Sequence, residues 1–265
     1  MLRRADTLLI VAATAAAFFL FSCSAIKETA VKTAPPKPAV STFKIMSLNT
    51  DHALQSRNDV KRFVQWMKKI APDVIALQQI DVPLEGKEGF DEPAEVAKQA
   101  EMYQLFGMAR YWYGKNSGNA VLSTYPIASP RVEALPAGKA KVRRSLVYGV
   151  VDLGVRSVAF ASTELDDQSP SERERQVKAI LHVAQRDSEF PLVVCGIFNE
   201  SASGQAASTM MKQFSLVNLL DGALGKTEQQ IYSVPDSVLK PVSVERISYS
   251  GTHTDAVVAT FEILK

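Results

Sequence analysis

This chain of 265 residues has few cysteines and histidines, and neither charge is in large excess. It has two cysteines and three histidines, and its formal net charge is +2 at pH 7. Two cysteines cannot build a disulfide framework, and no cysteine–histidine spacing typical of a zinc site occurs. The near-neutral charge argues against tight, sequence-independent binding of nucleic acid, which needs a marked basic surface. A glycine-rich phosphate loop, a nucleophilic serine or cysteine arrangement and an internal repeat are also missing, which excludes the enzyme and repeat classes that depend on them.

The N-terminus has the pattern of a targeting segment. After a basic start, residues from Thr7 to Phe21 form an unbroken apolar and small run. The next motif, Leu20-Phe-Ser-Cys23, resembles a bacterial lipobox, whose cysteine is acylated after cleavage. We therefore expect a signal peptide over residues 1–22 and a lipid on Cys23. The alternative is that the same apolar segment stays uncleaved as a signal anchor.

A polar, proline-rich stretch follows, and we expect residues 23–42 to be a linker. Proline-rich segments are extended and act as semi-rigid spacers, so this one would hold a folded domain off a membrane. The domain would then lie in the cell envelope and face the periplasm or the cell exterior. Residues 43–265 suffice for one substantial core and are too few for two domains. With Cys23 used by the lipid, we interpret Cys195 as a packed apolar residue.

Hydrophobic periodicity predicts many strands and two clear helices. Helical spacing predicts one helix over residues 59–70 and another beginning at Ser171, where Ser171 and Glu174 match a capping box. A weaker pattern indicates a helix over residues 94–106. Short strands are expected over residues 44–49, 74–77, 110–113, 120–123, 145–153, 158–162, 192–195 and 257–263. This favours an α+β fold, namely a four-layer α/β sandwich of two packed, mostly antiparallel sheets flanked by helices.

The strand that ends at Asn199 carries the most informative motif. Its sequence is Pro191-Leu-Val-Val-Cys-Gly-Ile-Phe-Asn199. It resembles the Gly-Asp-Phe-Asn signature of the endonuclease/exonuclease/phosphatase superfamily, the deoxyribonuclease-like metal-dependent phosphodiesterases. Ile197 stands where the signature has the aspartate that orients the attacking water. Isoleucine can neither orient water nor accept a proton.

Further segments resemble the same family in chain order, so the resemblance covers essentially the whole domain. They are residues 44–50, 73–81, 117–127, 143–146, 163–176, 230–232 and 251–259. Asn49 matches the metal-site asparagine, and Gln79 occupies the position of the metal-binding glutamate. Arg143 and Leu146 fit an Arg-x-x-Leu strand. Glu164 lies where the catalytic histidine belongs.

The remaining acidic positions are also replaced. Ile231 stands where the family commonly has an aspartate. In the last segment, His253 falls on the aspartate position and Thr254 on the histidine position, whereas a shift by one residue would return His253 to the catalytic place. We interpret Asn49 and Asn199 as remnants that hydrogen-bond loop backbone.

The substitutions have a direction, since positions that shape strands and turns survive while those that hold metal or move protons do not. Mg²⁺ prefers at least one anionic oxygen, and Gln79 offers only a neutral one. Losing several groups that act in the transition state leaves no useful rate. The resemblance therefore predicts a member that has lost metal-dependent phosphodiesterase activity and needs no cofactor. We expect it to bind or scaffold an unidentified envelope protein or small ligand.

A working phosphodiesterase or phosphatase is the first alternative. Its site would be rebuilt with Mg²⁺ or another divalent cation and with the side chains of Glu164, Asp166, His253 and Asn199. The carboxylate of Glu164 repels a phosphodiester and suits a cationic ligand or a relocated metal. The simpler expectation is that Glu164 is a solvated residue at a strand end.

A purely structural envelope component, whose cleft is filled by Ile197 and Ile231, is the second alternative. His52 follows Asn49 by three residues on a loop that should border the cleft, and we interpret it as a surface residue.

The densest basic run, residues 139–144, is interpreted as a solvated loop that leads into a strand.

Overall fold

The computed structural model describes residues 40–264 except 139–141, 221–227 and 235–237. The predicted signal peptide, the lipidation site Cys23 and most of the predicted linker lie outside the described residues. Within these ranges, none of the helices is both long and apolar enough to cross a bilayer.

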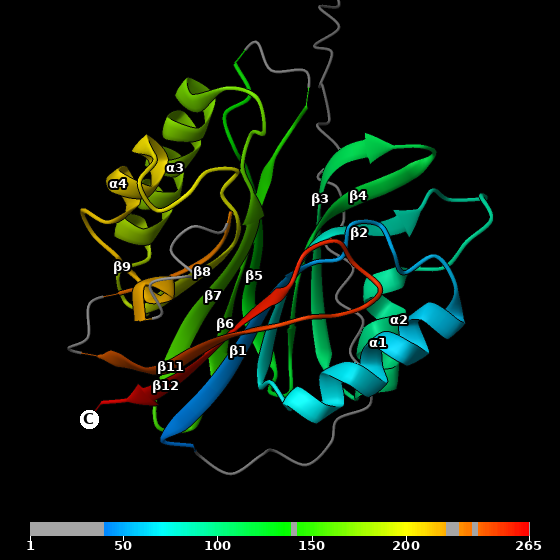
Figure 1. Ribbon diagram of the computed structural model, residues 1–265, viewed down its shortest axis with the longest axis horizontal. Helices are drawn as coiled ribbons and strands as arrows, with labels where there is room; N and C mark the ends of the chain where they lie inside the picture. Colours follow the sequence, from blue (N-terminus) through cyan, green and yellow to red (C-terminus); the bar gives the residue numbers. More distant parts are fainter. Residues whose placement is uncertain (1–39, 139–141, 221–227, 235–237, 265) are drawn as a thin grey trace, which may run out of the picture.

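Two six-stranded sheets pack face to face (Figure 1). The first has the order β11-β12-β1-β2-β4-β3, and the second has the order β5-β6-β7-β8-β10-β9. The first sheet comprises β1 (Thr42–Asn49), β2 (Val74–Pro83), β3 (Tyr103–Trp112), β4 (Lys115–Ser123), β11 (Leu239–Ile247) and β12 (Ala256–Ile263). The second comprises β5 (Ile127–Ala134), β6 (Ser145–Asp152), β7 (Ser157–Glu164), β8 (Leu192–Ile197), β9 (Ser215–Leu216) and β10 (Gln229–Ser233). Neighbouring strands are antiparallel except β1–β2 and β7–β8, which confirms the predicted, mostly antiparallel sandwich.

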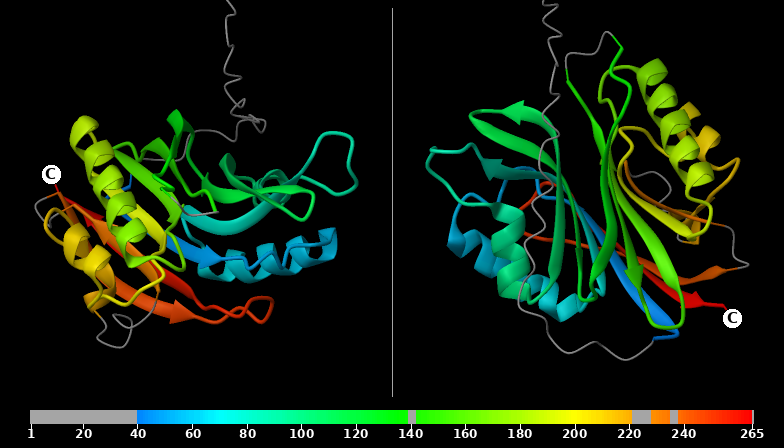
Figure 2. Two further views of the ribbon diagram at one scale, coloured as in Figure 1. Left: turned by 90° about the horizontal axis from the view of Figure 1, so that it is seen from above. Right: turned by 180° about the vertical axis from the view of Figure 1, so that it is seen from behind.

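Helices cover the outer faces of both sheets, as Figure 2 shows from two further directions. The helices are α1 (Arg57–Ile70), α2 (Glu92–Ala100), α3 (Pro170–Arg186) and α4 (Gln205–Met210), with a short 3₁₀ turn at Val217–Leu220. One apolar cluster lies between the sheets, a second lies under α1 and α2, and a third lies under α3 and α4. The layers are therefore helices, sheet, sheet and helices, as predicted.

The free cysteine Cys195 belongs to the cluster between the sheets. Its side chain is fully buried, and this burial raises the pKa of the thiol. The interpretation of Cys195 as a packed apolar residue is confirmed.

The predicted helix over residues 94–106 is wrong in its second half. Helix α2 ends at Ala100, and Glu101 adopts a left-handed conformation with φ of +60° before β3 begins. Within β3 the side chains alternate, since Leu105 packs between the sheets while Phe106 packs toward the helices. The few apolar residues of this segment fit a helical and a strand period equally well, so the spacing did not distinguish them.

The second predicted helix begins earlier than Ser171. Ser169 caps α3 by accepting a hydrogen bond from the backbone N–H of Glu172, and Pro170 takes the first helical position. Proline suits that position because its fixed φ is helical and its missing N–H needs no partner. The hydroxyl of Ser171 instead lies 3.0 Å from that of Ser169.

Sequence patterns gave no signal for β5, β9, β10, β11 or α4. Strands β5, β9 and β11 lie at sheet edges, and the side chains of β11 are mostly exposed. Edge strands are held largely by backbone pairing, so their side chains need no apolar period.

Candidate functional site

The family-like positions gather at one end of the sandwich, where β1, β2, β7 and β8 finish. Asn49 ends β1, Glu164 ends β7 and Ile197 ends β8. Gln79 lies in a bulge of β2, where the pairing register with β4 shifts and the residue has a φ of +53°. A bulge changes the direction of a side chain relative to the regular strand pattern. Here the side chain of Gln79 points toward Glu164 on the second sheet. We call this end of the molecule the loop end.

Glu164 is the centre of a closed group of ion pairs at the loop end. Its Oε1 accepts a hydrogen bond from Gln79 Nε2 at 3.1 Å, contacts Arg144 Nη1 and lies 3.9 Å from Arg110 Nη1. The side chain of Glu164 is 9% exposed and that of Arg144 is 1% exposed. Arg144 Nη2 also donates to Asp167 Oδ1 at 3.2 Å. The expectation of a solvated Glu164 is wrong, because its carboxylate is buried and neutralised.

The basic run before β6 supplies the buried arginine. Residues 139–141 lie outside the described residues, Arg143 is exposed, and Arg144 is buried. The reading of this run as a solvated loop is therefore wrong at Arg144, one residue after the arginine that the family match indicated. A guanidinium is buried only with a counter-charge, and Glu164 provides it.

The two site asparagines hold loop backbone, as expected. Asn49 Oδ1 accepts from the backbone N–H of Asp51 at 2.9 Å. Asn199 Nδ2 donates to the carbonyl oxygen of Leu165 at 2.7 Å. Thr254 lies beside the first of these turns and donates from Oγ1 to the carbonyl oxygen of Asn49 at 3.3 Å.

The divalent metal that the family resemblance implies does not fit these residues. Gln79 points its NH₂ group at Glu164, and the carboxylate of Glu164 is paired with Arg144. A cation placed there would meet two guanidinium groups and only neutral amide oxygens. Throughout the described part of the chain, no three His, Cys, Asp or Glu side chains are grouped so that they would hold a metal ion.

The four residues of the rebuilt-site alternative do not converge. Asp166 Oδ1 accepts from the backbone N–H groups of Gln168 and Ser169 at 3.0 and 2.6 Å. His253 contacts Asp51 with a side chain that is 93% exposed. Glu164 is paired elsewhere, so the predicted catalytic constellation of Glu164, Asp166, His253 and Asn199 is not assembled.

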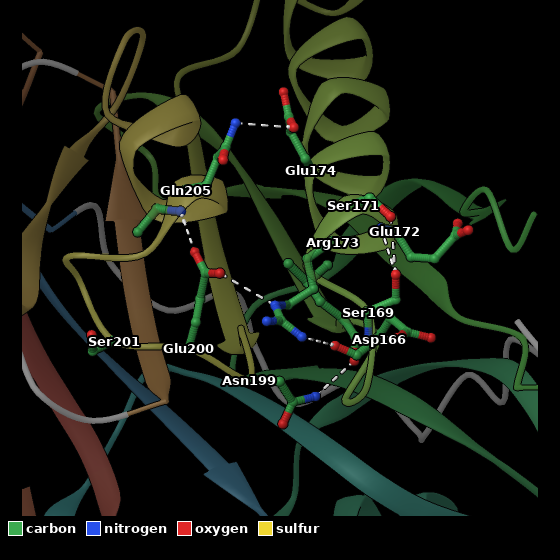
Figure 3. A network of polar contacts seen from close by, with 12 residues as sticks. Asp166, Ser169, Ser171, Glu172, Arg173, Glu174, Asn199, Glu200, Ser201 and Gln205 are labelled. Carbon is green, nitrogen blue, oxygen red and sulfur yellow. Dashed lines mark hydrogen bonds and ion pairs between the residues drawn. The ribbon is translucent and has the colours of Figure 1, made fainter.

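Arg173 ties together the loops after β7 and β8 (Figure 3). Its Nη1 donates to the carbonyl oxygen of Asp166 at 3.0 Å, and its Nε donates to Glu200 Oε2 at 3.2 Å. The other oxygen of Glu200 accepts from the backbone N–H of Ala207 at the start of α4. Asp166 and Asn199 therefore belong to a network that shapes backbone.

Ile197 and Ile231 occupy different environments. Alternation along β8 puts Ile197 on the same side as Val193 and Cys195, at the end nearest the loops, where it is 6% exposed. Ile231 is fully buried in the core between the sheets. It follows that Ile231 does not fill a cleft, and this part of the structural alternative is wrong.

Gln229 is the residue of β10 that reaches the loop end. It pairs with Ile197 across the sheet, and its Nε2 donates to Ser47 Oγ and to Gln78 Oε1 at 2.5 and 2.9 Å. Gln78 Nε2 in turn donates to Ser162 Oγ at 3.0 Å. A buried layer of polar side chains therefore lies beneath the loop end, which hydrophobic periodicity could not reveal.

His52 is held inside the loop end, contrary to its interpretation as a surface residue. Its side chain is 16% exposed, and Nδ1 lies 3.0 Å from both carboxylate oxygens of Asp81. The imidazole stacks on Trp112 with ring centroids 5.1 Å apart and planes 10° apart. The guanidinium of Arg110 lies 4.8 Å from the Trp112 ring centroid, which links this group to the ion pairs of Glu164.

Asp81 also belongs to a cluster with a second carboxyl group. Lys115 Nζ lies 3.6 Å from Asp81 Oδ2 and 3.2 Å from Glu92 Oε1, and Glu92 Oε2 accepts from the backbone N–H of Asp81. Burial, aided by the charge of Asp81, raises the pKa of Glu92 to about 7. No sequence pattern indicates that Asp81, Glu92 and Lys115 meet, because their contact depends on the fold.

A family of known proteins matches most of this chain by sequence. The family is described as "Endonuclease/Exonuclease/phosphatase family", and the match spans residues 46–222. No curated protein matches the sequence.

Solved structures of low sequence identity share the fold. An endonuclease/exonuclease/phosphatase from Beutenbergia cavernae DSM 12333 is 19% identical with a TM-score of 0.71, covering 84% of this chain and 72% of that one. The human Nocturnin catalytic domain with bound sulfate is 15% identical with a TM-score of 0.70, covering 84% and 94%. The mannosyl-6-phosphatase Bt3783 of Bacteroides thetaiotaomicron VPI-5482 is 11% identical with a TM-score of 0.61, covering 84% and 100%.

Proposed function

Because the chain belongs to the endonuclease/exonuclease/phosphatase family, we propose that it is a member without metal-dependent hydrolysis whose loop end serves as a binding surface. One observation carries this proposal. The residues at the metal-ligand and catalytic-histidine positions, Gln79 and Glu164, hydrogen-bond to each other, and two arginines neutralise the carboxylate.

The side chains that metal-assisted phosphodiester hydrolysis needs for each step are missing at the family positions. Gln79 provides no anionic oxygen for a metal, Ile197 cannot orient a water, and Glu164, whose carboxylate is held by two arginines, cannot contact the phosphate as the family histidine does. Removing one group that acts in the transition state typically costs about 3–4 kcal/mol of activation free energy. Three such losses at one site support the loss of activity and disfavour the alternative of a working phosphodiesterase or phosphatase.

An aromatic hairpin tip beside the site supports a binding role. Tyr111, Trp112 and Tyr113 are 59%, 36% and 89% exposed, although large aromatic side chains are usually buried. We call these three residues the aromatic tip. Tyrosine and tryptophan are enriched in binding interfaces, where they contribute large contact areas at low entropic cost. Stacking on His52 fixes one face of Trp112 in place.

The direction of the chain fits attachment to a membrane from the other end of the sandwich. Strand β1 runs from Thr42 toward the loop end at Asn49. A lipid on Cys23, followed by the linker through residue 42, would therefore reach the domain at the end opposite the aromatic tip. Metabolic labelling with a radioactive fatty acid tests this anchor, since the label should disappear in Cys23→Ser.

Hydrolysis assays test the proposed loss of activity. The purified protein and its Gln79→Ala variant are compared on bis(p-nitrophenyl) phosphate and p-nitrophenyl phosphate with Mg²⁺, Mn²⁺ or Ca²⁺. We expect equal background rates for both proteins. A metal-dependent rate that falls in Gln79→Ala would contradict the proposal.

A further inference from the structure

One oxygen atom at the loop end is surrounded by three donor groups, one in a hydrogen bond and two in ion pairs. Glu164 Oε1 receives Gln79 Nε2, touches Arg144 Nη1 and lies 3.9 Å from Arg110 Nη1. The donors come from β2, β3 and the residue before β6, so both sheets contribute to the arrangement. Convergent amide and guanidinium donors are the usual means by which proteins bind carboxylate and phosphate groups.

Both arginines retain donors that the described residues leave unused. Arg144 Nε and Arg110 Nε are buried and have no hydrogen-bond partner among the described residues. A buried donor without an acceptor is costly, and a guanidinium presents five N–H groups where Glu164 offers two oxygens. Arg110 is also held against the ring of Trp112, which limits its freedom to turn elsewhere.

We propose that Arg110 and Arg144 form an oxyanion-binding site for a carboxylate or phosphate group, and that Glu164 occupies this site in the free protein as an intramolecular competitor. The inference rests on the proposed binding function, in which the ligand is held and not hydrolysed. A ligand oxyanion must displace the carboxylate of Glu164, so its apparent affinity is reduced by the fraction of molecules in which the site is closed.

Shortening Glu164 opens the site and tests the proposal. Glu164→Ala removes the buried counter-charge of Arg144 and Arg110, leaving Arg144 paired only with the exposed Asp167, and opens a space about the size of acetate. We expect acetate and phosphate to bind this variant at least about 10-fold more tightly than they bind the unaltered protein, and to raise its Tm. Glu164→Gln is the matched control, because it removes the charge but keeps the volume, and it should show no such gain.

A second substitution identifies the binding residues. In the Glu164→Ala background, Arg144→Gln should abolish the acetate and phosphate effects. Equal responses with and without Arg144 would overturn the proposal, as would a folded Glu164→Ala protein that responds only to ionic strength, with sodium chloride as the reference. A response to acetate alone would point to a carboxylate group of the partner, and one to phosphate alone would point to a phosphate ester.

Folding of the variant is part of the test. If Glu164→Ala does not fold in chloride, refolding in acetate or phosphate supplies the missing counter-ion, and recovery of native circular dichroism supports the site. Failure to recover in either anion contradicts it. Hydrolysis is assayed on the same samples. A metal-dependent rate would contradict the proposed function, whereas the anion-binding results would still test the Arg110–Arg144 site separately.

Discussion

The side-chain amide of Gln79 donates a hydrogen bond to the carboxylate of Glu164 across 3.1 Å. These residues stand at the family positions of a metal-binding glutamate and a catalytic histidine, so the two replacements support each other. A glutamate at position 79 would repel Glu164, and a histidine at position 164 would leave Arg144 without its buried counter-charge. The loss of the catalytic groups is therefore accompanied by new local bonding.

Gln79→Glu should destabilise the protein by about 1–2 kcal/mol, because it replaces a hydrogen bond by two facing carboxylates. Urea denaturation measures the change. Adding Glu164→Gln should recover part of the loss and reveal the coupling in a double-mutant cycle. Additive effects of the two substitutions would mean that the side chains do not interact.

Restoring two family acids should restore affinity for a metal. Gln79→Glu combined with Ile197→Asp adds two carboxylates, one in the bulge of β2 and one at the end of β8, and we expect Mg²⁺ binding that neither single variant has. Calorimetric titration of the folded double variant measures it. The pair Gln79→Ala and Ile197→Ala controls for loosened packing. No binding by a folded double variant would show that the loss extends beyond these positions.

Much of the fold could be predicted from the sequence because local patterns determine it. Helix α1 has its apolar stripe, although it begins at Arg57 and not at Asp59 as the spacing predicts, and the central strands have apolar runs bounded by turns. Edge strand β11 could not be predicted because its exposed side chains carry no period. The prediction of a helix near Leu105 is wrong because its short apolar spacing fits both the helical and the strand period.

The sequence predicts where the candidate site lies but not which of its side chains contact each other. Family-like motifs placed Gln79 and Glu164 at one end of the sandwich, yet their hydrogen bond joins residues 85 apart in the chain. The sequence predicts Arg144 and His52 to be surface residues, because no neighbouring residue indicates that each contacts a buried carboxylate in the fold. Pairing of distant charges is decided by sheet packing, which sequence spacing does not encode.

Stability should fall as the pH rises from about 4.5 to about 7, because of Glu92. Its pKa is about 7 in the folded protein against 4.5 ordinarily, so the folded state binds the proton more tightly. The favourable contribution is complete below pH 4.5 and is lost as the pH rises through 7, amounting to about 3 kcal/mol at most. Urea unfolding at pH 5 and pH 8 measures this difference.

Glu92→Gln should flatten that pH dependence and stabilise the protein at pH 8. Glu95→Gln on the same helix is the matched control, because the pKa of Glu95 is lowered by its hydrogen bond with Gln99 and by Arg57. An unchanged pH dependence in Glu92→Gln would assign the effect to other groups.

Gly196→Ala should destabilise the protein severely, by more than about 3 kcal/mol. Gly196 has a φ of +154°, and an added Cβ would lie 1.9 Å from the carbonyl oxygen of Thr163 on the neighbouring strand. Gly86→Ala separates the two causes, because Gly86 has a φ of +75° but open space around it and should cost only about 1 kcal/mol. Equal losses of unfolding free energy would show that β7 yields to the new methyl group.

Calorimetric titration of the purified protein with Mg²⁺, Mn²⁺ and Ca²⁺, followed by assay of phosphodiester hydrolysis on the same samples, tests the central claim most directly. The arrangement of Gln79, Glu164 and Arg144 predicts no saturable binding at millimolar metal and no hydrolysis above background. Saturable binding together with hydrolysis that disappears in Glu164→Gln would contradict it and would establish a working metal site at the loop end.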